Sequence, residues 1–231
     1  MKMNIRNALA ACFAIFTLTA LAGDSKPISL FNGKDLSGWK ALGKPPVQWK
    51  YGKAALDTAD PTKLLVEGEG AADEIVSPEK GVNLSSEATF GDCLVELEFM
   101  VAKDSNSGVK LMNIYEIQIF DSFGKEVADK LDSGAVYSET APKLNAAKKP
   151  GEWQTLSIDF RAPRFDASGM KTANAKFVKV VMNGQVVQEN VEIAHGTNVS
   201  RNAKEHPTGP IYLQGDHGPV AFRNFKVTPI N

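Results

Sequence analysis

The sequence predicts an all-β sandwich of antiparallel sheets, and three observations support this class. Apolar and polar residues alternate with a period of two through much of the chain, as in strands that bury one face. No segment carries a sustained helical stripe of apolar residues, and glycine and proline interrupt the chain at short intervals. With 231 residues, the chain is long enough for one domain with a substantial core.

The chain begins with a predicted secretory signal peptide over residues 1–22. Two basic residues precede an apolar run at residues 8–20, and small residues lead up to Gly23. This run is too short to be read as a membrane span. We therefore expect a secreted or periplasmic protein whose single mature domain covers residues 23–231. Lipidation at Cys12 is a less favoured alternative, because the apolar run continues beyond that cysteine.

Strands are expected wherever the alternation is strict. In the segment LVELEFMV (residues 94–101), Val95, Leu97, Phe99 and Val101 share one face. The segment that contains Asn183-Gly184 should form a hairpin, since this dipeptide suits a two-residue turn between strands. The remaining expected strands lie within residues 107–113, 115–121, 153–160, 176–193 and 209–227.

Segments without periodicity are expected to form longer loops. They cover residues 58–80, 139–152, 163–175 and 195–209. Loops of this length in a compact domain often carry function.

The charge balance and the cysteines exclude some classes. The 26 basic residues are matched by 27 acidic residues, so no basic surface for nucleic acid is indicated. After removal of the signal peptide, Cys93 is the one cysteine left, and no intramolecular disulfide can form. We interpret Cys93 as a small buried hydrophobe rather than a reactive thiol.

The segment YEIQIFDSFG contains the first candidate site residues. Glu116 and Gln118 alternate with apolar residues that should face the core, and the parity of the preceding strand places Lys110 on the same outer face. If the sheet curves, an acid, an amide and a lysine on its concave face could hold a sugar-sized ligand. The alternative is an ordinary solvated face, on which Glu96, Glu98 and these three residues pair across strands.

Other segments add polar candidates. Asp216 and His217 lie between two glycines, where an imidazole could serve as acid or base beside a carboxylate. Asn106 lies in a polar turn that could direct it at a ligand. Two arginines, Arg161 and Arg164, could bind an anion or form salt bridges. We interpret the other histidines, His195 and His206, as structural or solvated.

No metal motif with diagnostic spacing is present, and the cofactor is unknown. A divalent cation held by Asp and Glu oxygens is left open. The oligomeric state is not predicted.

Several segments, taken in their order along the chain, resemble the 3-keto-disaccharide hydrolase domain family. They are ISLFNGKDLSGWK, FGDCLVELEFMV, SNSGV, YEIQIFDS, GAVYSETAPKLNAAKKPGEWQTLSIDFRAPRFD and LQGDHGPVAFRNFKV, and they run from Ile28 to the end of the chain. The resemblance implies a concanavalin A-like jelly roll of two antiparallel sheets. It also implies a secreted or periplasmic bacterial protein that cleaves glycosides whose sugar carries a ketone at carbon 3.

By motif, the pocket residues of that family fall on Glu116, Gln118, Asp121 and His217, with Arg223 and Asn106 as weaker matches. This sequence departs from the family where an aromatic residue, a glycine and an arginine are common. It has Lys110, Asn113 and Ile114 at these positions.

The chemistry of a keto sugar requires such residue types. A ketone at carbon 3 acidifies the hydrogen on carbon 2, so a base can remove it and expel the anomeric oxygen. Either Glu116 or His217 could be this base, with the other as the acid that protonates the leaving group. Our hypothesis makes Glu116 the base and His217 the acid, with Gln118 and Lys110 orienting the keto sugar. The candidate substrate-binding residues are Gln118, Lys110, Asn106, Asp121, Asp216 and Arg223.

Two alternatives belong to other classes. The same sandwich could be a non-catalytic carbohydrate-binding module of the cell envelope, or a scaffold protein without a small ligand. An ordinary glycosidase is less favoured, because Glu116 and Asp121 have opposite strand parity and should face opposite sides of the sheet.

Overall fold

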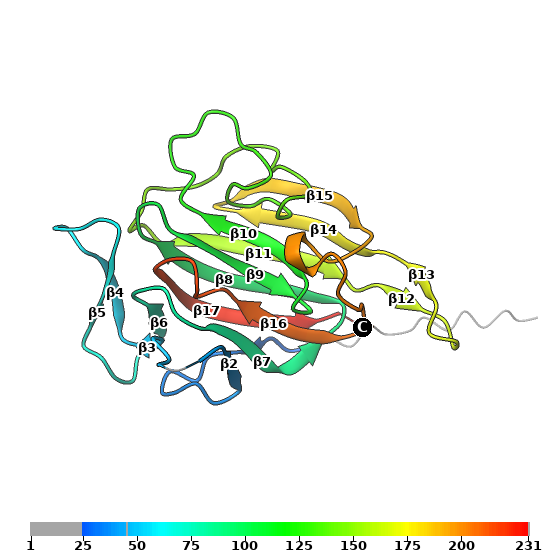
Figure 1. Ribbon diagram of the computed structural model, residues 1–231, viewed down its shortest axis with the longest axis horizontal. Coiled ribbons are helices and arrows are strands. Elements are labelled where there is room, and N and C mark those ends of the chain that lie inside the picture. Colours follow the sequence, from blue (N-terminus) through cyan, green and yellow to red (C-terminus); the bar gives the residue numbers. More distant parts are fainter. Residues whose placement is uncertain (1–24, 45, 231) are drawn as a thin grey trace, which may run out of the picture.

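Two antiparallel sheets stack face to face in the computed structural model, which describes residues 25–44 and 46–230 (Figure 1). The predicted all-β jelly-roll sandwich is thereby confirmed. The predicted signal peptide and Cys12 lie outside the described residues. Within the described part of the chain, no helix has the length and apolar character needed to cross a membrane.

The larger sheet has the strand order β15-β14-β11-β8-β17-β6-β3, with β1 also paired to β17. Its strands are β15 (Gln185–Ile193), β14 (Ala175–Met182), β11 (Gln154–Arg161), β8 (Cys93–Val101), β17 (Val220–Pro229), β6 (Glu74–Ser77), β3 (Lys50–Tyr51) and β1 (Ile28–Ser29). The smaller sheet has the order β10-β9-β16-β7-β2. Its strands are β10 (Tyr115–Phe120), β9 (Asn106–Leu111), β16 (Gly209–Leu213), β7 (Asn83–Phe90) and β2 (Trp39–Leu42).

The core lies between these sheets and is built by the alternation seen in the sequence. The larger sheet contributes Phe99, Phe160 and Phe222, each without exposed surface, and the smaller sheet contributes Tyr115 and Ile117. Each such side chain stabilises the fold by about 1.5–3 kcal/mol relative to an exposed one. Because Tyr115 and Ile117 of β10 face this core, the residues that alternate with them, Glu116 and Gln118, face the outer side of the smaller sheet.

Cys93 belongs to this core, with 1% of its surface exposed. Burial raises the pKa of its thiol to about 12, so the thiolate does not form near neutrality. The interpretation of Cys93 as a buried hydrophobe is confirmed.

The predicted hairpin at Asn183-Gly184 connects β14 and β15. Both turn residues have positive φ, 51° and 79°, as a type I′ turn requires.

The loop predictions were wrong in part. Residues 58–80 include β6 and β5 (Leu64–Glu67), which pairs with β4 (Lys53–Leu56). The hairpin β4–β5 covers part of the outer face of the larger sheet through a second apolar cluster that contains Leu64 and Met100. Residues 163–175 contain β12 (Arg164–Phe165) and β13 (Lys171–Ala173), and residues 195–209 contain the 3₁₀ helix η1 (Asn198–Ser200). Strands of two to four residues are too short to show a period of two, so the sequence pattern does not reveal them.

Candidate functional site

Polar side chains form an array on the outer face of the smaller sheet, across β10, β9 and β16. Glu116 pairs with Lys110 of β9, which pairs in turn with Tyr212 of β16. In the next row, Gln118 pairs with Gly108. Three adjacent strands therefore bring groups distant in sequence to one surface.

Glu116 and Lys110 form the closest kind of cross-strand pair. The backbone of Glu116 makes its hydrogen bonds on the side away from β9: its N–H donates to Thr197 Oγ1 (3.2 Å), and its carbonyl accepts from Tyr137 N–H (3.1 Å). Residues without mutual backbone hydrogen bonds lie nearer to each other in an antiparallel pair. Their side chains meet with Lys110 Nζ 3.4 Å from Glu116 Oε2.

This ion pair is buried: Glu116 is 2% exposed and Lys110 is 7% exposed. The ammonium of Lys110 also lies 4.9 Å from the centre of the Tyr212 ring. Gln118 is equally buried, so the alternative of a solvated face is wrong for these three residues. It does describe Glu96, which is exposed on the other sheet.

Gly108 makes room for the carboxylate of Glu116. A Cβ atom at position 108 would lie 2.2 Å from Glu116 Oε1, far inside contact distance. The glycine thus lets the acid lie across β9 rather than point away from the sheet.

The free edge of β10 is covered by an irregular segment, residues 133–140. Gln118 N–H donates to Ala135 O (3.0 Å), and Gly134 N–H donates to Gln118 O (2.8 Å). The side-chain amide of Gln118 donates to Asn106 Oδ1 and to Leu131 O, at 3.2 Å each. Because these contacts fix both backbone and side chain, Gln118 is held in one orientation.

The turn after β16 brings Asp216 and His217 together. His217 Nδ1 lies 2.5 Å from Asp216 Oδ1. At that distance the carboxylate accepts the Nδ1 hydrogen, which leaves Nε2 as the nitrogen available to a ligand. The side chain of His217 is 53% exposed, so a ligand can reach it.

Asn83 of β7 holds this turn in place. Its Oδ1 accepts from the N–H groups of Gly215 (2.8 Å) and Asp216 (3.2 Å), and its Nδ2 donates to Asp216 Oδ2 (3.0 Å). Partial burial acts to raise the pKa of Asp216, but the hydrogen bonds from Asn83 and His217 hold it below its ordinary value. Asp216 is therefore a carboxylate near neutrality.

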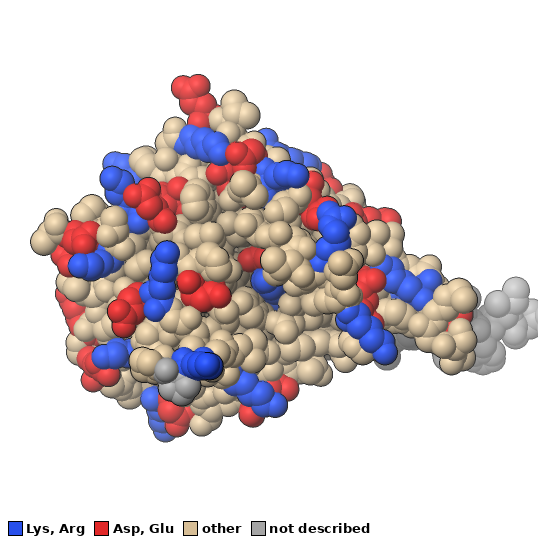
Figure 2. All heavy atoms as spheres, in the orientation of Figure 1, with Lys and Arg blue, Asp and Glu red and all other residues tan. Residues whose placement is uncertain are grey.

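The charges of the turn act on Glu116. Burial raises the pKa of Glu116 above its ordinary value; Lys110 and His217 oppose the rise and Asp216 adds to it. The turn and the ion pair thus belong to one electrostatic site. In Figure 2 the surface is hollowed over the region where Figure 1 shows β9 and β10, and acidic and basic atoms lie in the hollow.

Two predicted site residues lie elsewhere. Arg223 is on β17 of the larger sheet, where its Nε donates to Glu98 Oε2 (2.8 Å) and its guanidinium lies 4.1 Å from the centre of the Trp153 ring. Asp121 follows β10 and accepts from the N–H groups of Asp104 (3.0 Å) and Phe123 (3.4 Å), so it caps turns. Neither joins the array of Glu116.

The remaining arginine and histidine candidates have structural partners. Arg161 and Arg164 form ion pairs with Asp92, at 3.8 Å and 2.6 Å. His195 Nε2 lies 2.8 Å from Arg201 Nη1, and His206 is exposed. The salt-bridge interpretation of the two arginines is therefore the one that the structure supports.

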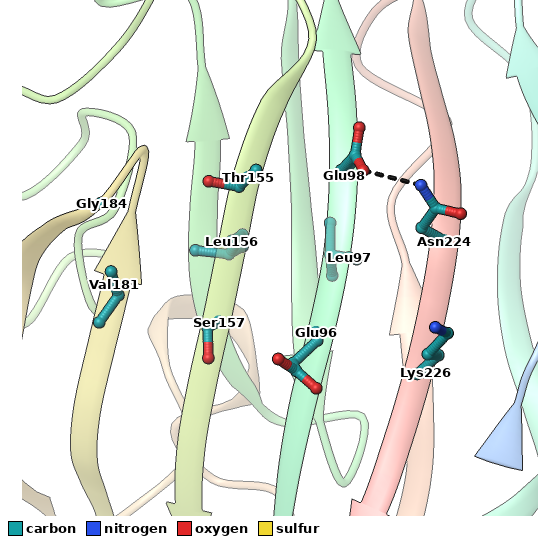
Figure 3. A pocket seen from close by; sticks show the side chains of 10 residues that line it. All are labelled: Glu96, Leu97, Glu98, Thr155, Leu156, Ser157, Val181, Gly184, Asn224 and Lys226. Atoms are coloured by element: carbon teal, nitrogen blue, oxygen red, sulfur yellow. Dashed lines mark hydrogen bonds between the residues drawn. The ribbon is translucent and has the colours of Figure 1, made fainter. Parts of the chain in front are cut away.

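A cavity of about 520 Å³ lies on the outer face of the larger sheet, whereas Glu116 lies on the smaller sheet. Figure 3 shows its polar side chains projecting from β8, β11 and β17, with Asn224 donating to Glu98. The polar side chains that line it are Glu96, Glu98, Thr155, Ser157, Asn224 and Lys226.

No group of three or more His, Cys, Asp or Glu side chains in the described residues could hold a metal ion.

Sequence reasoning missed Asn83, Gly108, Tyr212 and Thr197. The alternation of residues 209–213 could have placed Tyr212 opposite the core, but nothing local indicates that β16 pairs with β9. Asn83 is 133 residues from Asp216, and no local pattern links the two.

The comparisons with known proteins agree with this fold. A family model described as a 3-keto-alpha-glucoside-1,2-lyase-like domain matches residues 26–228. A crystal structure from Parabacteroides distasonis, provisionally described as a glycosyl hydrolase, is 27% identical with a TM-score of 0.68, covering 88% of this chain and 84% of that one. No curated protein matches the chain.

Two further crystal structures from the same organism, also provisionally described as glycosyl hydrolases, have TM-scores of 0.58. One is 17% identical and covers 89% of this chain and 94% of its own. The other is 20% identical and covers 89% of this chain and 100% of its own. At these identities the likeness concerns the fold alone.

Proposed function

Because this chain belongs to the 3-keto-alpha-glucoside-1,2-lyase-like domain family, we propose that it cleaves glycosides whose sugar carries a ketone at carbon 3. Membership of the family makes it a carbohydrate-active protein. The keto-sugar substrate and the residue roles below are our proposal.

One observation supports this reaction more than any other: the buried Glu116 shares its site with the Asp216–His217 pair. Glu116 lies on β10, the pair lies after β16, and their charges act on one another. Elimination needs a base near carbon 2 and an acid near the anomeric oxygen, and these two groups come from opposite sides of β9.

Glu116 is assigned the role of base. Its raised pKa gives the carboxylate a greater affinity for the proton on carbon 2 than that of a solvated glutamate. Removal of this proton produces an enolate, whose negative charge Lys110 is placed to stabilise. The electron pair then forms the double bond between carbons 1 and 2 as the anomeric oxygen leaves.

His217 is assigned the role of acid. Asp216 holds Nδ1 at 2.5 Å, which leaves the Nε2 hydrogen for the departing oxygen. Water then adds to carbon 1 of the unsaturated ketone, and the product is the free keto sugar.

Turnover on matched substrates tests this function. The mature chain is incubated with a 3-keto-disaccharide and, separately, with the unoxidised parent disaccharide, each with and without a chelator. We expect sugar release from the keto compound alone, and loss of release in Glu116→Gln. Sensitivity to the chelator would add a cation to the mechanism.

Two results would contradict the proposal. Equal release from the parent disaccharide would indicate an ordinary glycosidase. Saturable binding of the keto compound without any release would instead identify a carbohydrate-binding module.

A further inference from the structure

Lys110 has a more specific role open to it than stabilising a negative charge. Resting on the proposed function, we propose that Lys110 is a nucleophile that forms a Schiff base with the ketone of the substrate. Three observations support this step: the burial of the lysine, its distance to a single carboxylic acid, and the chemistry of the substrate.

Burial disfavours both charges of the Lys110–Glu116 pair. The side chains are 8% and 3% exposed, and their charged forms lose most of their hydration. Glu116 Oε2 lies 3.4 Å from Nζ, so this carboxylate is placed to take a proton from Lys110 as the amine attacks the ketone. A neutral amine is the form that attacks carbonyl carbon.

The groups that face Lys110 from the packed elements are few. Glu116 approaches from β10 and Tyr212 from β16. The charges of Asp216 and His217, in the turn after β16, act on Glu116. Burial raises the pKa of Tyr212, so the phenol stays neutral and adds no charge beside the amine. Among the described residues, Glu116 is the one carboxylate that forms an ion pair with Lys110.

The Schiff base improves the same elimination. The amine adds to carbon 3 of the ketone, and one proton moves from nitrogen to oxygen to give a carbinolamine. Glu116, in its acid form, protonates the hydroxyl, which leaves as water, and a protonated imine remains. A protonated imine withdraws electrons more strongly than a ketone does, so the hydrogen on carbon 2 becomes more acidic.

The remaining steps restore every group. The Glu116 carboxylate removes the proton from carbon 2, and an enamine forms. The nitrogen lone pair then drives the bond between carbon 1 and the anomeric oxygen to break, while His217 protonates that oxygen. One water adds to carbon 1 and gives its surplus proton to His217, and Glu116 returns a proton to carbon 2. A second water then hydrolyses the imine, which restores the ketone and the Lys110 amine. The net reaction consumes one water and involves no oxidation or reduction.

Reductive trapping tests the covalent step. Sodium cyanoborohydride reduces protonated imines to stable amines, so the chain is incubated with this reagent and a 3-keto-disaccharide, and its intact mass and peptide map are measured. We expect one sugar adduct, located at Lys110, together with a loss of activity that follows adduct formation. The unoxidised parent disaccharide should give no adduct.

Two variants sharpen the result. Lys110→Arg keeps the positive charge but cannot form an imine, so the adduct should disappear and kcat should fall by at least about 10²-fold. Lys103→Arg, at an exposed lysine outside the array, should retain both adduct and turnover. Thermal unfolding of each variant establishes that it is folded.

The outcomes separate this step from the proposed function. Turnover of the keto compound by the wild type without an adduct at Lys110 would overturn the Schiff base and leave the elimination intact. An adduct on other lysines alone would overturn it as well. If neither turnover nor an adduct is seen, both the proposed function and the covalent step fail.

Discussion

The substitution Gly108→Ala tests whether the position of the Glu116 carboxylate determines activity. The added Cβ would lie 2.2 Å from Oε1 and 3.1 Å from Cδ of Glu116. Ordinary contact begins near 3.4 Å, so the carboxylate must move by about 1 Å. Position 108 is not among those with positive φ, so alanine strains the backbone little.

A displacement of about 1 Å can lower a rate by about 10²-fold, which corresponds to about 2.7 kcal/mol in the activation free energy. We therefore expect kcat/KM on a 3-keto-disaccharide to fall by about this factor. The free energy of unfolding should fall by only about 1–3 kcal/mol, the usual effect of overpacking, because the atom that must move ends a side chain.

The matched control is Gly91→Ala, in the turn between β7 and β8. There the added Cβ would lie 3.0 Å from Pro207 O, and kcat/KM should stay within about twofold. Stability is followed by urea unfolding and activity by initial rates. If Gly108→Ala is folded and keeps kcat/KM within about threefold of the wild type, the placement of Glu116 does not limit the reaction and the assignment of the base is wrong.

Three further predictions concern single residues. Burial raises the pKa of Glu116 above 4.5, so kcat/KM should rise with pH through a value above 4.5, and a rise centred at 4.5 would contradict this. The free energy of unfolding should fall over the same pH range, because ionisation of the buried acid disfavours the fold. Glu116→Gln should lower kcat by about 10²–10⁴-fold. Asn83→Ala should shift the pH profile of kcat and lower kcat more than it raises KM, since Asp216 loses its support; an unchanged profile would make Asn83 merely structural. Arg223→Lys should lower the unfolding midpoint through its contacts with Glu98, yet leave kcat/KM within about twofold; a large loss of activity would return Arg223 to the site.

Strand parity is the part of the site that the sequence could predict. Glu116, Gln118 and Lys110 share a face because their apolar neighbours are committed to the core, and an antiparallel pair preserves that relation. The depth of their burial could not be predicted. Residues 133–140, which bond to the backbone of β10 at its edge, have no periodic pattern of their own that could reveal this contact.

The sequence could not predict which strands become neighbours, because strands far apart in the chain pair with each other. The strand β16 lies between β9 and β7, although it follows β7 by more than a hundred residues. Local patterns specify which face a residue takes, but not which strand becomes its neighbour. The assignment of Arg223 illustrates this limit, because its strand belongs to the other sheet and its guanidinium serves Glu98 and Trp153.

Substitutions of Glu116 and Lys110 can test whether their buried pair serves catalysis or the stability of the fold. Removing one partner of a buried ion pair typically costs about 3–5 kcal/mol, because an uncompensated charge is left. Replacing both partners by apolar residues of similar size is often neutral or stabilising by about 1–4 kcal/mol. If the pair exists for catalysis, Glu116→Leu combined with Lys110→Met should be at least as stable as the wild type in urea, while each single variant is less stable and none of the three turns over the keto sugar. A double variant that is much less stable than the wild type would show instead that the fold itself requires the pair, and its burial would no longer favour a catalytic role.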